Sequence, residues 1–211
     1  FVNKAIAELC LVAVAEQEES DEAPSDIFWR EVDDLRDLLK FEFFYPPTEV
    51  FHAEIVKELD AITPDWQEEL DRGARGARKL LLQMTPQTAH MTLQMFVEAY
   101  AIGAEILTAV LPGESIDESD YVVRCMNYGQ QAFMQRRISS EVSASKLLFQ
   151  NCWKLLGARG LTDESKPDYA LERQLQAQSL TNLVRRVEII RASAIAARGT
   201  ATIRDTIRGK I

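Results

Sequence analysis

The segment Asp33–Pro47, with the sequence DDLRDLLKFEFFYPP, says most about how the chain folds. Its first half has the i, i+3, i+4 spacing of apolar residues that is typical of an amphipathic helix: Leu35, Leu38 and Leu39. Four aromatic residues then fall within five positions, and two prolines close the segment. Pro46 lacks a backbone N–H and disfavours helical geometry at the residue before it, so we expect the helix to end at Tyr45.

The aromatic residues of this segment can be interpreted in two ways. Each of them removes roughly 150–250 Å² from water when it is buried. Either they bury the end of one helix and hold two helices together, or they form an exposed aromatic end that meets a partner domain or a lipid surface. The candidates for domain packing are Phe41, Phe43, Phe44 and Tyr45 from this segment, with Phe96 and Tyr100 from a later one. Neither interpretation supplies catalytic chemistry.

Helical patterns follow one another along the rest of the chain, and no alternation of period 2 is long enough to predict a strand. We therefore expect an all-α fold, an irregular bundle of about seven to eight helices. The longest core helix should run from Thr85 to about Leu111, and because it is apolar on most sides it should lie at the centre of the bundle. Gly103 within it costs about 1 kcal/mol relative to Ala, which predicts close packing against another helix.

Charged residues are unevenly distributed along the chain. Residues 1–71 carry 5 Lys and Arg against 20 Asp and Glu, a net charge of −15, whereas residues 171–211 have a net charge of +5. A protein that binds nucleic acid needs a basic surface to neutralise phosphates. The acidic first part of the chain therefore argues against a nucleic-acid partner.

Residues 162–211 are predicted to form a basic amphipathic helix and tail, following a helical domain at residues 1–161. The helix should run from about Pro167 to Arg198, and Gly199 should end it. Between its apolar positions lie the candidates for binding an anion or a lipid head group: Arg185, Arg186 and Arg191. Such a helix either lies on an anionic membrane surface or docks across the acidic surface of the same protein.

Two further basic segments leave alternatives open. Arg136 and Arg137 stand at the end of a predicted helix, where cations stabilise the free carbonyl groups, or they contact an anionic substrate or another domain. Residues 72–78 read RGARGAR. This segment is either a flexible surface joint or an anion site, since glycine allows backbone N–H groups to approach an anion closely.

No catalytic or metal-binding pattern is visible in the sequence, and we expect neither a metal nor a cofactor. The three cysteines have no paired spacing and should be buried free thiols in a reducing compartment: Cys10, Cys125 and Cys152. The longest apolar run, Ala5–Ala15, is interrupted by Glu8 and falls short of the roughly 20 residues that a membrane-spanning helix needs.

Several segments, in order and spacing, resemble the C-terminal region of bacterial, actinobacterial-like glycerol-3-phosphate acyltransferases, the PlsB family. FVEAY at residues 96–100 is similar to the family's FLEAY helix. Residues 129–141, which contain GQQ and end in RRISSE, are similar to its "GRQ…GRI.S.E" turn. The resemblance extends over about residues 1–160 and also includes residues 1–9, 35–44 and 143–161.

That family transfers an acyl group with a His-x4-Asp pair, in which the histidine is the general base. In this chain the fifth residue after His52 is Lys57, and the fifth after His90 is Met95. The resemblance therefore implies a non-catalytic C-terminal part of such an enzyme, with the chemistry in residues upstream of Phe1.

The resemblance also implies partners and a location. The upstream catalytic domain of the same protein would be the partner, and the parent enzyme would use acyl-CoA or acyl-ACP and glycerol 3-phosphate for phospholipid biosynthesis. The protein would lie peripherally on the cytoplasmic face of the bacterial cell membrane, whose anionic surface is a further candidate partner. The alternative is a free-standing helical scaffold or interaction module without catalysis.

Overall fold

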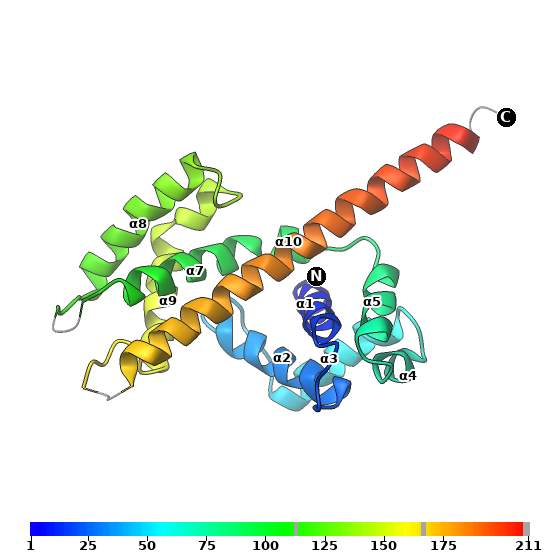
Figure 1. Ribbon diagram of the computed structural model, residues 1–211, viewed down its shortest axis with the longest axis horizontal. Helices are drawn as coiled ribbons and strands as arrows, with labels where there is room; N and C mark the ends of the chain where they lie inside the picture. Colours follow the sequence, from blue (N-terminus) through cyan, green and yellow to red (C-terminus); the bar gives the residue numbers. More distant parts are fainter. Residues whose placement is uncertain (112–113, 166–167, 209–211) are drawn as a thin grey trace. The chain divides into compact units, whose positions relative to one another are not determined.

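The computed structural model describes residues 1–111, 114–165 and 168–208, with side chains as far as Ala197. Within these ranges the chain forms ten α-helices, one 3-10 helix and no strand (Figure 1). The all-α prediction is confirmed. The helices outnumber the seven or eight expected, in part because two of them are very short, α4 (Trp66–Leu70) and α6 (Ala89–Thr92).

The remaining elements are α1 (Val2–Glu16), α2 (Pro24–Leu38), α3 (Thr48–Asp60), α5 (Ala74–Gln83), α7 (Gln94–Thr108), α8 (Glu118–Met134), η1 (Glu141–Ala144), α9 (Lys146–Ala158) and α10 (Tyr169–Arg208). Asp117 caps α8 by accepting a hydrogen bond from the backbone N–H of Asp120 at 2.9 Å. Gly160, with φ of 73°, follows α9 in the left-handed conformation that ends many helices.

The described residues divide into two compact units. The first unit contains Phe1–Arg36, Tyr45–Thr92 and the chain from Arg186 onward; the second contains Asp37–Phe44 and Leu93–Arg185. The segment predicted as a separate helix and tail, 162–211, is therefore shared between the units, because α10 contributes to both.

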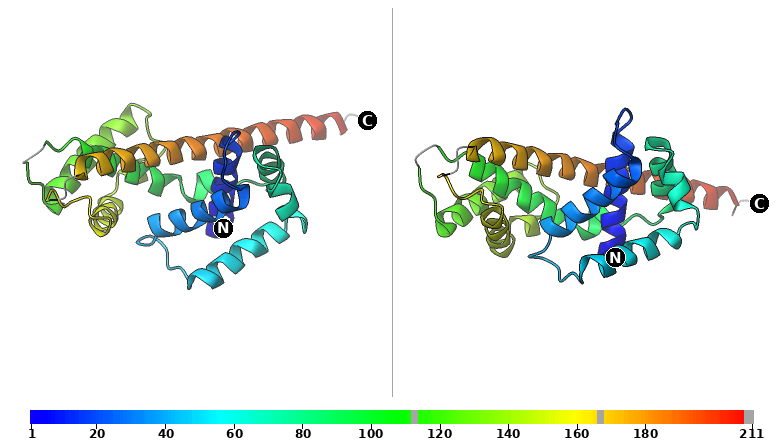
Figure 2. Two further views of the ribbon diagram at one scale, coloured as in Figure 1. Left: turned by 60° about the horizontal axis from the view of Figure 1, so that its bottom comes forward. Right: turned by 90° about the horizontal axis from the view of Figure 1, so that it is seen from below.

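The core of the first unit is built around α1. From Ala5 to Ala15 this helix is buried on every side, and it packs against α3, α5 and α6 (Figure 2). A helix that is apolar around its circumference belongs at the centre of a bundle. The central helix of this unit is therefore the N-terminal one.

In the second unit, α7 packs against both α8 and α9, and these two also pack on each other (Figure 1). Gly103 of α7 lies where the three helices meet. A Cβ atom there would stand 2.2 Å from the hydroxyl of Tyr121 and 2.5 Å from the sulfur of Cys152. The predicted close packing at Gly103 is confirmed.

The single long helix predicted from Thr85 to Leu111 is wrong. The chain instead forms α6, passes through Leu93 with φ of −114°, and begins α7. The backbone N–H groups of Thr88 and Ala89 bond to Glu8 of α1, which ties this end of the segment to the first unit. Within the predicted span, α7 covers only Gln94–Thr108.

Three other expectations require correction. The helix of the opening segment ends at Leu38 rather than Tyr45, because tight turns follow in which Glu42 and Phe43 donate to the carbonyl of Leu39. Most of RGARGAR is helical, since α5 begins at Ala74. Gly199 does not end the last helix, which continues to Arg208; Pro167, the predicted start, lies outside the described residues.

The three cysteines are buried and free, as predicted. Burial raises the pKa of the Cys125 and Cys152 thiols to about 12. They are therefore protonated and unreactive near neutral pH.

Candidate functional site

Three of the segments that resemble the acyltransferase family meet around Glu98 in the second unit: residues 96–100, 129–141 and 143–161. This side chain is only 3% exposed. Its carboxylate accepts hydrogen bonds from the backbone N–H of Ser139 at 2.9 Å, the hydroxyl of Ser143 at 2.6 Å and the side-chain amide of Gln94 at 3.0 Å. The FVEAY segment and the turn after α8 are thus joined by one buried carboxylate.

A second polar cluster joins FVEAY to the aromatic segment. The hydroxyl of Tyr100 donates to the carboxylate of Glu42 at 2.7 Å, and the amide of Asn151 reaches the same carboxylate at 3.3 Å. Beside this cluster, the rings of Phe43 and Phe96 meet edge to face with centroids 5.0 Å apart. These polar and aromatic contacts between the family-like segments stabilise the second unit.

The predicted packing aromatics therefore have different surroundings. Phe43, Phe96 and Tyr100 lie within the second unit, as described. Tyr45 belongs to the first unit, where its ring is 5.1 Å from that of Phe51 and burial raises the pKa of its hydroxyl. Phe41 is 38% exposed and Phe44 is 98% exposed.

Arg136 and Arg137 follow the C-terminus of α8. The N–H of Arg137 donates to the carbonyl of Ala132 at 2.8 Å, a closure that places Arg136 in the left-handed region with φ of 59°. No other non-glycine residue in the described chain has a positive φ. Both side chains are exposed.

Carboxylates and an aromatic ring surround the guanidinium of Arg137. Its guanidinium lies 5.1 Å from the ring centre of Tyr128 and 3.7 Å from Glu105, and the Tyr128 hydroxyl donates to Glu105 at 2.5 Å. These side chains line a cavity of about 190 Å³ together with Glu98 and several apolar residues. One cation beside two carboxylates does not make a strong anion site.

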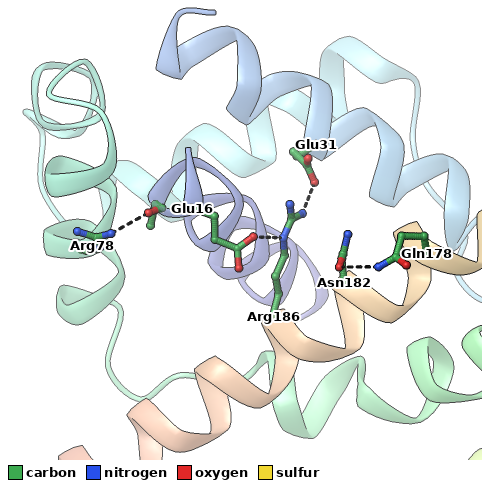
Figure 3. Close-up of polar contacts among 7 residues, drawn as sticks. Glu16, Glu31, Arg78, Gln178, Asn182 and Arg186 are labelled. Carbon is green, nitrogen blue, oxygen red and sulfur yellow. Dashed lines mark hydrogen bonds and ion pairs between the residues drawn. The ribbon is translucent and has the colours of Figure 1, made fainter. Parts of the chain in front are cut away.

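The arginines of α10 differ from one another. Arg186 is 14% exposed and bonds to Glu16 at 2.9 Å and to Glu31 at 2.7 Å (Figure 3). Burial opposes its charge, but the two carboxylates outweigh burial and raise its pKa. These two ion pairs are the contacts expected if α10 docks onto the acidic N-terminal segment. Arg185 and Arg191 are exposed, and Arg191 lies 3.4 Å from Glu188 on its own helix.

The RGARGAR segment lines a cavity of about 370 Å³ in the first unit. Arg72 pairs with Glu69 at 2.7 Å, and Arg78 bonds to Glu18 and to the carbonyl of Ala15. Glu18 and Glu22 line the same cavity, so it presents both signs of charge. Two of the three arginines in RGARGAR therefore form ion pairs with carboxylates.

Sequence reasoning missed the buried charged side chains. Glu8 is fully buried and accepts from the N–H groups of Thr88 at 2.9 Å and Ala89 at 2.7 Å. Arg173 is 3% exposed and donates to the carbonyl of Leu161 at 2.8 Å. The available signal for Glu8 and Glu98 was a carboxylate inside an apolar helical run, because such a group must be hydrogen-bonded once buried.

The histidines form no metal site. His52 of α3 bonds to Asp33 of α2 at 2.7 Å, and its ring lies 4.6 Å from that of Trp29. This pair is separated by 19 positions and was not visible as a sequence motif. Within the described residues there is no group of three metal-ligating side chains, and no helix is long and apolar enough to cross a membrane.

Comparison with known proteins decides the family. Residues 1–165 match the model of the glycerol-3-phosphate acyltransferase C-terminal region. The chain belongs to this family. Its relatives include the putative acyltransferases plsB1 of Mycobacterium bovis and Mycobacterium tuberculosis, each 33% identical over 191 residues. No solved structure matches it.

The match covers 90% of this chain but only 31% of each mycobacterial relative. The resemblance seen in the sequence is therefore confirmed at the level of the family. The chain spans about a third of the length of these relatives, and the residues that match the family model include the Glu98 and Glu42 clusters.

Proposed function

We propose that the chain is the non-catalytic C-terminal part of a glycerol-3-phosphate 1-O-acyltransferase and braces the catalytic domain. The parent enzyme would transfer an acyl group from acyl-CoA or acyl-ACP to glycerol 3-phosphate in phospholipid synthesis. One observation carries this proposal: polar groups of the family-like segments, led by Glu98, bond to one another within the second unit. A scaffold needs such bonds, whereas a catalytic carboxylate must be free to reach a substrate.

The proposal is tested by acyl transfer from a radiolabelled long-chain acyl-CoA to glycerol 3-phosphate. The 211-residue chain is compared with the complete polypeptide that contains it. We expect product only with the complete polypeptide. Product from the 211-residue chain alone would refute the non-catalytic role, and no product from a folded complete polypeptide would favour the scaffold alternative.

We also propose that the protein associates peripherally with an anionic membrane surface, and that Arg185 and Arg191 rather than Arg186 provide the cations. The side chain of Arg186 is only 14% exposed, whereas the side chains of Arg185 and Arg191 are exposed and can reach a lipid surface. Each surface cation near anionic lipid contributes about 1 kcal/mol.

Co-sedimentation with phosphatidylglycerol vesicles tests this proposal. Binding should weaken about tenfold or more when both exposed arginines are changed to Gln, by the same estimate of about 1 kcal/mol each. Arg124→Gln, at an exposed arginine of α8, is the control and should bind nearly as the unchanged protein does. Equal loss in the double variant and the control would contradict this role for α10.

A further inference from the structure

The outward face of α8 is uncharged over the C-terminal part of the helix, from Cys125 to Met134. No charged residue occurs between Arg124 and Arg136. Three apolar side chains on the helix are exposed, Val123 by 55%, Phe133 by 38% and Met134 by 74%. With the half-buried Met126 they recur at spacings that place them on one side of a helix.

This face continues into a groove of about 520 Å³ between α8 and the start of α9. Val122, Val123 and Met126 line it from α8, and Lys146 and Gln150 line it from α9. Glu118 also lines it, so the groove has one charge of each sign and an apolar floor. An apolar centre with a polar edge is the composition that protein interfaces usually bury.

Leu82 of α5 provides a contrast. It is 65% exposed, about as much as Val123 and Met134, but Arg78 and Lys79 stand four and three positions before it on the same helix. A single exposed leucine among cations is ordinary, whereas several exposed apolar side chains on one side of a helix indicate an interaction surface.

We infer that the α8 face and its groove are the surface on which the rest of the acyltransferase polypeptide docks. This inference rests on the proposed function. The occupant would be the part of the polypeptide that lies outside this chain. The mycobacterial relatives contain such a part, because this chain covers only 31% of their length. An anionic lipid surface fits poorly, because Glu118 and Asp120 occupy one end of α8 and a lipid-binding helix surrounds its apolar side chains with cations.

Cysteine labelling in the complete polypeptide tests the inference. Val123→Cys, Met134→Cys and, as the matched control, Leu82→Cys are each treated with a charged maleimide under native conditions. Modified peptides are quantified by mass spectrometry. The chain's own cysteines are buried with raised thiol pKa values, so they contribute little background.

We expect the cysteines at positions 123 and 134 to react at least about tenfold more slowly than the one at position 82, because a docked surface must open before it reacts. Equal rates at the three positions would overturn the inference. Protection that disappears on dilution would also overturn it, since it would identify a second copy as the occupant.

Acyl transfer by the same polypeptides separates this inference from the proposed function. An inactive but folded unchanged polypeptide refutes the function, while the labelling rates still report on the surface. In an active polypeptide, Val123→Glu combined with Met134→Glu should lower acyl transfer at least about tenfold, through loss of apolar burial, and Leu82→Glu should not. Circular dichroism checks that each variant remains helical, and unchanged activity in the double variant would count against docking.

Discussion

Two glycines inside helices, one in each unit, show how differently the units achieve close packing. At Gly76 of α5, a Cβ atom would lie 1.5 Å from the backbone carbonyl oxygen of Glu69 in α4. At Gly103 of α7, its nearest neighbours would be side-chain atoms of Tyr121 and Cys152. A side chain can rotate away from a new methyl group, but a carbonyl moves only with its helix. At these two positions, the backbones of two helices come into contact in the first unit, whereas side chains fill the contact in the second unit.

The sequence predicted only one of these contacts. Gly103 stands within an apolar helical run, where glycine is costly and therefore informative. Gly76 stands among arginines in RGARGAR, a composition that is equally typical of a flexible joint. Only the packing of α4 against α5 distinguishes a tightly packed glycine from a loop glycine at this position.

Gly76→Ala should produce the largest loss of stability. The new methyl group cannot fit against the Glu69 carbonyl, so we expect the free energy of unfolding to fall by at least about 3 kcal/mol. Urea denaturation followed by circular dichroism measures this loss. A change below about 1 kcal/mol would mean that α4 moves easily and that backbone approach does not distinguish the first unit.

Glu98→Ala should have the next largest effect and tests the second unit's polar centre. It leaves the N–H of Ser139 and the hydroxyl of Ser143 without their shared acceptor, and we expect a loss of about 2–3 kcal/mol. Glu98→Gln keeps one carbonyl acceptor and should lose less. Equal stability of the Ala variant and the unchanged chain in urea would show that water replaces these bonds.

Gly103→Ala should destabilise by about 1–3 kcal/mol, less than the change at Gly76. Because the Tyr121 hydroxyl is the nearest obstacle, the loss should shrink when Tyr121 is also changed to Phe, and a double-mutant cycle in urea measures this coupling. Gly157→Ala in α9 is the control: its Cβ would be 3.7 Å from Thr162, so it should not destabilise. Strict additivity of the changes at 103 and 121 would contradict the side-chain explanation.

The buried Glu8 of the first unit should make the stability of the chain depend on pH. Burial raises the pKa of Glu8 above its ordinary value of 4.5, although hydrogen bonds from Ala89 and Thr88 act in the opposite direction. The folded state then holds its proton more tightly than the unfolded state. The contribution of Glu8 is therefore full below pH 4.5 and declines as pH rises through the higher folded value. Relative to Glu8→Gln, the unchanged chain should lose stability over that range, as urea titrations at several pH values would reveal; a difference independent of pH would contradict the raised value.

Arg136→Gly should give the smallest effect, and a favourable one. An arginine with φ of 59° occupies a conformation that glycine adopts without strain, so we expect a gain of about 0.5–1 kcal/mol in the free energy of unfolding. Thermal unfolding measures it, and Arg137→Gly serves as a comparison because Arg137 is not among the residues with positive φ. Equal effects at both positions would show that backbone strain is not the cause.

The sequence alone determined what neighbouring residues decide among themselves. Helical spacing predicted an all-α chain, the apolar cysteines indicated buried thiols, and several short segments indicated the acyltransferase family. These features depend on residues a few positions apart, because helix periodicity, capping and proline geometry act over one or two turns. The helices that were wrongly bounded, around Leu39, Arg75 and Leu93, are those where distant residues compete with the local pattern.

Only the tertiary structure decided which charged groups are available. Arg186 and Arg191 look alike in the sequence, yet Arg186 is held by Glu16 and Glu31 from helices more than 150 positions away. Glu98 stands in an apolar helical run that indicates burial, but its partners Ser139 and Ser143 lie more than 40 positions away in the sequence. Burial makes an unpaired charge costly, so the fold supplies partners from wherever the chain brings them. Local pattern cannot name those partners, because they are neighbours in space and not in sequence.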